Sequence, residues 1–204
     1  MIRFKQSIQF PEFTGLRCLM MPYIQGDTSS IPSEYESYFP ILEDLFFKKG
    51  DIGFLTIDES FVSKGKAHRG ARSEHGRALH TEAGMRPTSY GWGPSWGSTG
   101  PVELDEETMV LLANNLENSC ALWDATHRDT TDDGDIGHLG HLYPYEDAQI
   151  MKPGEAWEIG ILTPHESLPV EKDFNRQFLR IVSSGVHGRE PYFTENPLMP
   201  RFVA

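Results

Sequence analysis

The spacing of apolar residues changes near Gly50, from a helical repeat before it to short strand-like runs after it. Residues 17–24 form an apolar run that suits a buried strand. Ser33 and Glu36 then have the Ser-x-x-Glu spacing of a helical capping box. Apolar side chains follow at helical intervals, at Tyr35, Tyr38, Phe39, Leu42, Leu45 and Phe46. This pattern predicts a helix over about 34–48, which Gly50 terminates.

After Gly50 the chain consists of short runs rich in aliphatic and aromatic residues, separated by turn-forming residues. The runs that we expect to form strands are 54–57, 61–62, 109–113, 120–123, 149–151, 156–162 and 178–182. Segment 109–113 could also form a short helix, but the apolar run that follows it favours a strand. Lys152-Pro153-Gly154 predicts a turn between two strands. Many short strands after one early helix indicate a mainly β fold, closed or sandwiched.

The length of 204 residues predicts a single domain. We divide it into a helix-bearing N-terminal part (about 1–50), a β core (about 51–183) and a C-terminal extension (184–204). The hydrophobic content of 38% is ordinary for a soluble globular protein. The formal net charge of −12 argues against binding to a nucleic-acid backbone, which requires clustered Lys and Arg.

The sequence contains no feature that predicts a membrane partner or secretion. No apolar run approaches the roughly 18 residues that a membrane-spanning helix needs. The first six residues contain no apolar segment of a secretory signal. Cys18 and Cys120 are far apart in the sequence, and we expect free thiols in a reducing compartment. These features predict a cytoplasmic protein, with the formation of a homo-oligomer left open.

Two histidines and a glutamate could together bind a metal ion. His80 and Glu82 are separated by one residue, so on an extended chain both side chains point to the same side. His165 lies 85 residues after His80, which leaves room for several strands between them. If the three side chains converge, they form the two-histidine, one-carboxylate face that is typical of non-haem Fe(II). Glu166 could orient the His165 imidazole, or belong to a turn at the strand end.

A second pair of candidate ligands stays open. His127 and Asp129 have the same one-residue separation and lie only 38 residues before His165, counted from His127. This interval leaves room for about two strands, and the pair opens an aspartate-rich stretch, 129–135. A chain without a metal site is the third possibility.

Three short motifs are similar to those of a known enzyme family. They are His80-Thr81-Glu82, then Lys152-Pro153-Gly154-Glu155 leading into a strand that ends at His165, and Arg176 eleven residues after His165. With these motifs the chain resembles the Fe(II)/2-oxoglutarate-dependent dioxygenases over residues 51–183. The His-Thr-Glu step is similar to the variant of clavaminate-synthase-like members. The resemblance implies a double-stranded β-helix (jelly-roll or cupin-like), one Fe(II) ion, and an oxidation coupled to the decarboxylation of 2-oxoglutarate.

The resemblance also implies a role for each candidate residue. His80, Glu82 and His165 would be the metal ligands. The planar guanidinium of Arg176 would pair with the far carboxylate of 2-oxoglutarate. Arg180 lies on the same strand face and is the alternate clamp. Arg176 could equally belong to a surface salt bridge, and the Arg-x-Ser step of several family members is absent because position 178 is Phe.

A long loop, residues 84–100, is rich in Gly, Pro, Ser and Trp. Loops of this length are usually functional or disordered, and two indoles argue against disorder. Trp92 and Trp96 could cover the substrate, or they could anchor the loop. We therefore expect an oxygenase that hydroxylates or otherwise oxidises a small-molecule or peptide substrate. The alternatives are a cupin-like metal enzyme without 2-oxoglutarate and a non-catalytic jelly-roll protein with a structural or assembly role.

Overall fold

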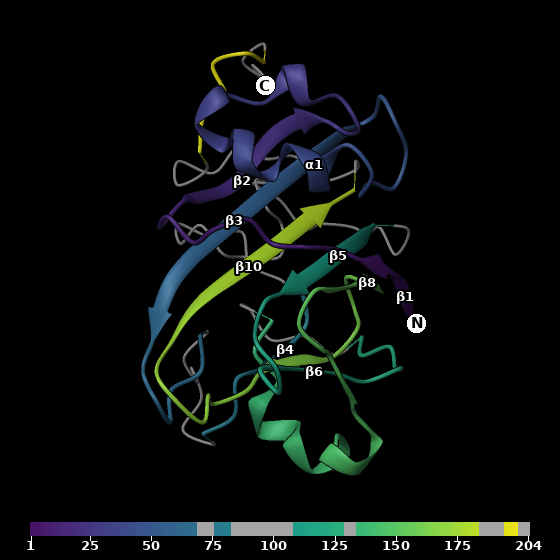
Figure 1. Cartoon of the computed structure of the whole chain (residues 1–204). Helices are drawn as coiled ribbons and strands as arrows, with labels where there is room; N and C mark the ends of the chain where they lie inside the picture. The colour runs from purple at the N-terminus through teal and green to yellow at the C-terminus, as the bar shows by residue number, and fades with distance from the viewer. Residues whose placement is uncertain (69–75, 83–107, 129–133, 184–193, 200–204) are drawn as a thin grey trace.

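The computed structural model describes five segments of the chain, residues 1–68, 76–82, 108–128, 134–183 and 194–199. In these segments the protein is mainly β, with short helices and two antiparallel sheets, which is consistent with a β-sandwich (Figure 1). The prediction of a mainly β fold is confirmed.

The larger sheet has six strands in the order β1-β8-β5-β10-β3-β2. Their bounds are β1 (Ile2–Ser7), β8 (Glu155–Gly160), β5 (Met109–Asn114), β10 (Phe174–Val182), β3 (Ile52–Val62) and β2 (Arg17–Ile24). The long strand β10 lies inside the sheet, between β5 and β3. It begins four residues before the predicted start, so Arg176 lies within the strand.

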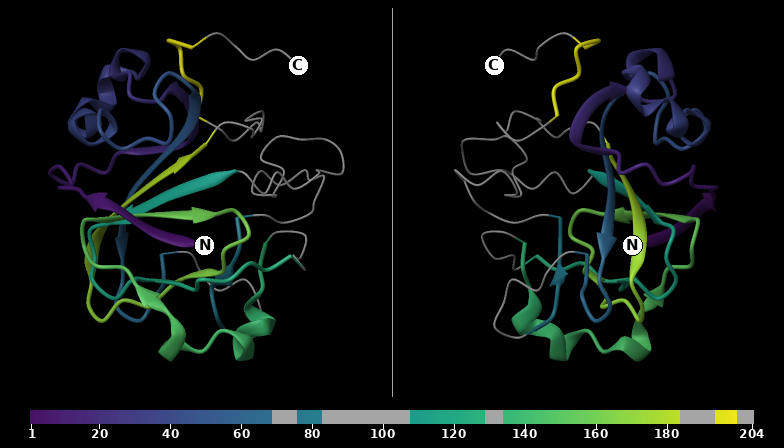
Figure 2. Two further views of the ribbon diagram at one scale, coloured as in Figure 1. Left: turned by 90° about the vertical axis from the view of Figure 1, so that its right-hand side faces the viewer. Right: turned by 60° about the vertical axis from the view of Figure 1, so that its left-hand side comes forward.

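The smaller sheet has four short strands in the order β4-β9-β6-β7. Their bounds are β4 (Leu79–His80), β9 (His165–Ser167), β6 (Cys120–Leu122) and β7 (Gln149–Ile150). The chain passes repeatedly between the two sheets, which Figure 2 shows from two further sides. An apolar cluster joins the sheets, with buried side chains from the larger (Phe54, Val110, Leu112, Ile159, Val182) and from the smaller (Cys120, Leu122).

The expectation that the strand after Gly154 continues to His165 is wrong, because the chain crosses from the larger to the smaller sheet before His165. Strand β8 ends at Gly160, whose carbonyl accepts a hydrogen bond from Thr163 N at 2.9 Å in a turn. Pro164 follows and has no N–H with which to continue the ladder. The chain therefore changes sheet, and His165 begins strand β9.

The predicted helix over 34–48 is wrong in its extent and its cap. The structure has a 3-10 helix, η2 (Ser33–Tyr38), followed by the four-residue α1 (Phe39–Leu42). Pro40 lies in the first turn of α1, and a proline within a longer α-helix would remove a hydrogen bond and clash with the preceding turn. The N-cap of η2 is Pro32, with no side-chain hydrogen bond, so the Ser33 capping box does not form.

The helical segment nevertheless buries the apolar face that its spacing predicted. It includes η1 (Thr28–Ser30) and lies against the larger sheet, at the top of Figure 1. Its buried side chains pack in one cluster with residues of β3, β5 and β10, among them Tyr35, Tyr38, Leu42, Leu45, Leu55, Leu111, Leu179 and Ile181. At the opposite end of the molecule, η3 (Gly137–Leu142) and η4 (Tyr145–Asp147) adjoin the smaller sheet.

The turn predicted at Lys152-Pro153-Gly154 is present, and Gly154 is required there. Its φ is +74°, in the left-handed region that favours glycine. A Cβ at this position would lie 2.6 Å from the carbonyl oxygen of Ile8. The close approach lets Ile8 N donate to Gly154 O at 2.7 Å, just beyond the end of β1.

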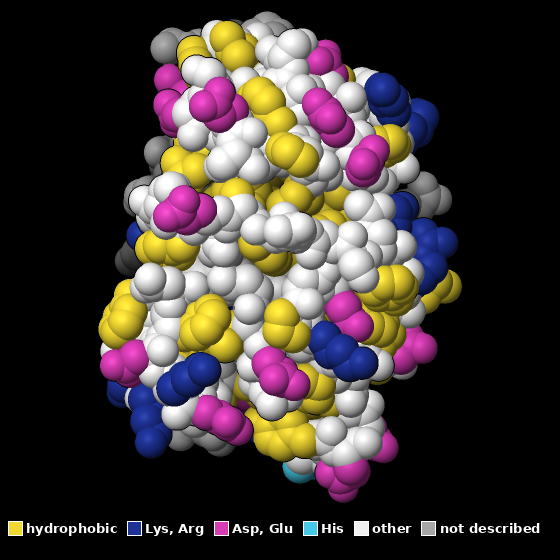
Figure 3. Space-filling model, viewed as in Figure 1, with side chains coloured by type: hydrophobic (Ala, Val, Ile, Leu, Met, Phe, Trp, Pro, Cys, Tyr) yellow, Lys and Arg dark blue, Asp and Glu magenta, His cyan; other side chains and the backbone are white. Residues whose placement is uncertain are grey.

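Cys18 and Cys120 are both free thiols, as predicted, and both are buried. None of the helices in the described segments has the length and apolar character needed to cross a membrane. On the face seen in Figure 3, acidic and basic side chains are interspersed with apolar ones.

Candidate metal centre

The smaller sheet brings His80 and His165 together as direct cross-strand partners. Strand β4 pairs with β9 in antiparallel register, with Leu79 opposite Glu166 and His80 opposite His165. The two imidazole ring centroids are 4.0 Å apart, and both side chains are buried. Residues that are 85 positions apart in the sequence are thus in contact because their strands are neighbours.

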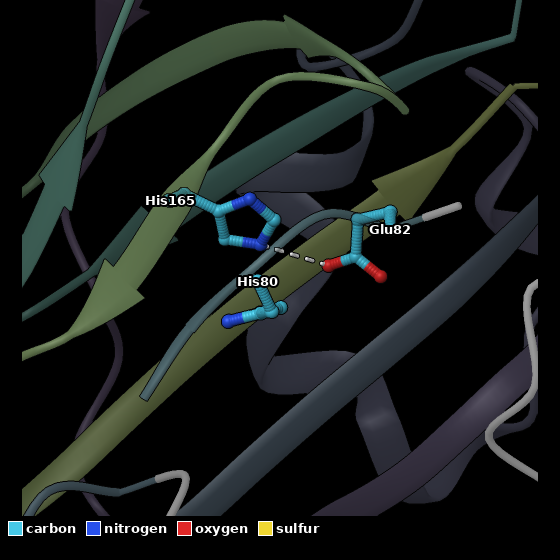
Figure 4. A group of neighbouring side chains, drawn as sticks. All are labelled: His80, Glu82 and His165. Atoms are coloured by element: carbon cyan, nitrogen blue, oxygen red, sulfur yellow. Dashed lines mark hydrogen bonds and ion pairs between the residues drawn. The ribbon is translucent and has the colours of Figure 1, made fainter. Parts of the chain in front are cut away.

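Glu82 completes the group from the segment that follows β4. Its backbone N donates to Ile161 O at 2.9 Å, which ties this segment to the crossing between the sheets. The Glu82 carboxylate then faces His165, with 3.3 Å between Oε1 and Nε2 (Figure 4). One potential ligand atom each from His80, Glu82 and His165 lies within 4.8 Å of the others. The three side chains converge as predicted, and this buried group could hold a metal ion.

Backbone carbonyls select the nitrogen that each imidazole presents. His80 Nδ1 lies 2.7 Å from Ala78 O, and His165 Nδ1 lies 2.9 Å from Thr163 O. A carbonyl oxygen only accepts, so Nδ1 carries the proton and Nε2 is the nitrogen of each ring that could coordinate a metal. The partner that orients His165 is therefore the Thr163 carbonyl. Both alternatives for Glu166 are wrong, because it lies within β9 rather than in a turn and its carboxylate is bound by Arg77.

The contact between His165 and Glu82 itself requires a positive charge. With the His165 Nδ1 proton donated to a carbonyl, a neutral ring would present a lone pair from Nε2 to the carboxylate. Two such acceptors 3.3 Å apart repel each other, whereas a proton on Nε2 or a cation bound by both atoms makes the contact attractive. The donor set therefore fits a metal with two imidazole nitrogens and one carboxylate oxygen.

Arg180 is the other partner of the Glu82 carboxylate. Its Nη1 donates to both oxygens, at 3.1 and 3.0 Å, and its Nη2 lies 3.4 Å from Thr56 Oγ1. Burial opposes ionisation of Glu82, but Arg180 and the hydrogen bond with His165 outweigh it and hold the pKa of Glu82 well below its ordinary value. The predicted alternate clamp is thus engaged with a metal-ligand candidate in this structure.

Arg176 is a buried cation, four residues before Arg180 on the same face of β10. Its side chain is 3% exposed, and its Cζ lies 5.4 Å from the centroid of the Phe178 ring. Burial lowers the pKa of Arg176 to about 10, a fall that Cys120 and Asp58 partly offset, so the group stays protonated at neutral pH. Among the described residues none forms an ion pair with it, and its Nε has no hydrogen-bond partner. Burial contradicts the alternative of a surface salt bridge.

A polar row on β3 faces the same interior and was not predicted from the sequence. His68 Nε2 lies 2.9 Å from Asp58 Oδ2 and 3.0 Å from Ser60 Oγ. Because one nitrogen makes both contacts, this group does not form a Ser-His-Asp relay, which uses the two nitrogens separately. The alternation of Thr56, Asp58 and Ser60 is the period-two pattern that could have revealed the row.

Arg77 and Glu166 form an ion pair on the face of the smaller sheet opposite to the His165 side chain. Arg77 Nε and Nη2 donate to Glu166 Oε2 at 3.0 and 2.6 Å, and the backbone N of Ala78 donates to Oε1 at 3.2 Å. The Arg77 guanidinium also lies 4.5 Å from the centroid of the Tyr145 ring, on η4. These contacts fix β4 against β9, and with them the register of the two histidines.

Of the remaining candidates, the structure describes only His127. His127 Nδ1 is hydrogen-bonded to the Tyr143 hydroxyl at 2.8 Å, and His127 is not a member of the His80 group. Its predicted companion Asp129 lies outside the described residues. Trp92 and Trp96 also lie outside them, so the substrate loop stays a prediction.

Comparison with known proteins adds no relative to this picture. Neither a protein-family model nor a curated protein sequence matches the chain.

Proposed function

We propose that the protein is a non-haem Fe(II)- and 2-oxoglutarate-dependent oxygenase with a jelly-roll fold, acting on a small molecule or peptide. The observation that carries the proposal is the buried convergence of His80, Glu82 and His165. Beside it, on a strand that also reaches Glu82, lies the cation of Arg176, which has no ion-pair partner within the described segments.

The strand order supports the jelly-roll assignment. From β3 to β10 the chain alternates between the sheets except at β6 and β7, which are neighbours in the smaller one. The strands β3-β10-β5-β8 of the larger sheet and β4-β9-β6-β7 of the smaller sheet, four from each, belong to two sheets that one apolar cluster joins. Eight strands in two facing antiparallel sheets are typical of jelly rolls.

The ligand set supports a metal of the iron class. Two imidazoles and one carboxylate leave other coordination positions open, which is the arrangement of oxygen-activating Fe(II) proteins. Iron bound here would supply the activation of dioxygen for the oxidation. The chain's own residues orient the imidazoles through the Ala78 and Thr163 carbonyls and keep the Glu82 carboxylate ionised beside Arg180.

The charges of the site support a dianionic co-substrate. Glu82 and Arg180 neutralise each other, so a divalent ion and Arg176 leave an excess of three positive charges among these groups. Arg176 and Arg180 are separated by about 13 Å along the strand, at roughly 3.3 Å per residue. A dicarboxylate such as 2-oxoglutarate can bring one anionic end to Arg176 and the other toward the metal-binding group. Arg176 as a planar bidentate donor suits a carboxylate.

Metal analysis tests the centre. We expect about one equivalent of iron in the wild-type protein purified under mild conditions, and loss of this iron in His165→Ala. His127→Ala is the matched control, because His127 belongs to the rival pair, and it should retain the metal. Iron loss in His127→Ala with retention in His165→Ala would reject the assignment.

Anaerobic titration tests the co-substrate. Fe(II) with 2-oxoglutarate should give a weak visible charge-transfer band, accompanied by 2-oxoglutarate binding in calorimetry. A silent spectrum and no binding would reject 2-oxoglutarate. Bound metal without such binding would then indicate a cupin-like metal enzyme, and stability insensitive to chelators would indicate a non-catalytic jelly-roll protein.

A further inference from the structure

Two buried side-chain donors on neighbouring strands have no hydrogen-bond partner in the part of the chain that the structure describes. They are Nε of Arg176 on β10 and Nδ2 of Asn114 on β5. The two residues are 3% and 1% exposed, respectively. Buried donors are nearly always satisfied in folded proteins, so two such groups in one region indicate that a ligand supplies the acceptors.

The Asn114 amide is held in one orientation. Its Oδ1 accepts hydrogen bonds from Leu116 N at 2.9 Å and from Ser119 Oγ at 2.8 Å. Both donors belong to the connection between β5 and β6. The Nδ2 group is therefore directed away from this connection, and rotation of the amide would sacrifice both bonds.

The register of the larger sheet places Asn114 beside Arg176. Asn114 is directly opposite Phe178, so their side chains lie on the same face of the sheet. Arg176 precedes Phe178 by two residues on that face, with its guanidinium 5.4 Å from the ring centroid. Ser119, which holds the Asn114 amide, directly precedes Cys120, and electrostatic interaction with Cys120 raises the pKa of Arg176 against the larger effect of burial.

We propose that Asn114 Nδ2 and the Arg176 guanidinium bind the same carboxylate, the far carboxylate of the 2-oxo dicarboxylic acid, and that Asn114 contributes to selectivity for this group. The inference rests on the proposed function. An amide N–H and a guanidinium present donors only, and an ionised carboxylate presents acceptors only, so the match is chemical as well as spatial. A 2-oxo acid without a far carboxylate gains nothing from Asn114.

Calorimetric titration of the metal-loaded protein under anaerobic conditions tests this role. Asn114→Ala should weaken 2-oxoglutarate binding by about tenfold or more, the value of one hydrogen bond to a charged acceptor. Ser119→Ala is the matched control, because it removes a bond to Oδ1 but keeps the Nδ2 donor, and it should lose less than Asn114→Ala. Pyruvate has the same 2-oxo acid end without the far carboxylate, and its binding should be equal in wild type and Asn114→Ala.

A second variant, Asn114→Asp, keeps the test decisive if Asn114→Ala does not fold. Asn114→Asp keeps both bonds accepted by Oδ1 but replaces the donor with a negative oxygen, so it should abolish detectable 2-oxoglutarate binding while metal content is unchanged. Wild-type affinity for 2-oxoglutarate in either folded variant, or an equal loss of pyruvate binding, would overturn the role of Asn114. Absence of 2-oxoglutarate binding in the wild type would instead reject the proposed function, and this inference with it.

Discussion

Arg180 and Glu82 form a buried ion pair in which one guanidinium nitrogen donates to both carboxylate oxygens, at 3.1 and 3.0 Å. Both side chains are almost fully buried. The pair keeps the carboxylate of a candidate metal ligand ionised although the group is buried. Arg176, four residues earlier on the same strand, has no such partner among the described residues. The charge of Arg180 is therefore compensated by a carboxylate, whereas no ion pair compensates the charge of Arg176 within those residues.

Replacing Arg180 should destabilise the protein chiefly when no metal is bound. Arg180→Met removes the largest charge compensation of Glu82 and leaves only the histidines beside it, and breaking a buried pair in this way costs about 3–5 kcal/mol. A divalent ion bound to Glu82 would restore much of this stability. Thermal unfolding with a chelator and with Mn(II) should therefore show a larger metal-induced rise in Tm for the variant than for the wild type. Equal losses in both conditions would contradict a role for Arg180 through Glu82.

Replacing Arg176 should have the opposite effect on stability. Arg176→Met removes a buried cation that has no ion-pair partner among the described residues, so the desolvation cost disappears with it. We expect unchanged or higher stability in urea unfolding, together with loss of 2-oxoglutarate binding. A destabilisation as large as that of Arg180→Met would show instead that Arg176 has a structural partner.

Glu59 provides a pH-dependent test of the contact between the N-terminal segment and the larger sheet. Its Oε2 accepts from the backbone amides of residues 14–16 at 2.6–2.9 Å, and its Oε1 accepts from Tyr38 at 2.7 Å and Gln177 at 2.8 Å. Burial raises the pKa of Glu59, but these hydrogen bonds, beginning with Gln177, lower it overall. Its folded pKa is thus below the unfolded value, so its stabilisation is present above about pH 4.3 and is lost as the pH falls through the folded pKa.

Glu59→Gln should cost about 2–3 kcal/mol at pH 7, because an amide turns a donor toward other donors. The difference from the wild type should shrink when urea unfolding is repeated below pH 4. Glu36→Gln, at an exposed position of η2, is the control and should show neither effect. A difference that does not change with pH would show that the charge of Glu59 is unimportant.

The ion pair behind the smaller sheet should influence metal binding without touching the metal. Glu166→Gln weakens the contact with Arg77, which fixes β4 against β9 and so places His80 opposite His165. We expect a loss of about 2–3 kcal/mol in stability and weaker Mn(II) binding in calorimetry, with a smaller loss of affinity than in His165→Ala. Tyr145→Phe removes only hydroxyl contacts of 3.2 Å to Glu166 and serves as the control. Unchanged metal affinity in Glu166→Gln would separate this pair from the centre.

The spacing of apolar residues predicted most strands correctly, but it misplaced several strand and helix boundaries. The apolar runs at 17–24 and 109–113 are strands β2 and β5, because a short run of this kind is stable only when buried in a sheet. Strand β1 was missed, since its side chains are exposed or half-buried at the edge of the larger sheet and leave no apolar run. The helix was overextended, because apolar spacing outweighed the effect of Pro40.

The sequence by itself determined the mainly β character and the donor side chains of the candidate metal centre, since strand-forming runs and side-chain chemistry are properties of individual residues. Only the tertiary structure decided which side chains meet. The neighbouring positions of β4 and β9 bring His80 to His165, and the path after β4 brings Glu82 to Arg180 rather than to Arg176. Spacing along one strand cannot distinguish two arginines on the same face, because the partner that separates them, Glu82, lies 98 residues before Arg180 in the sequence.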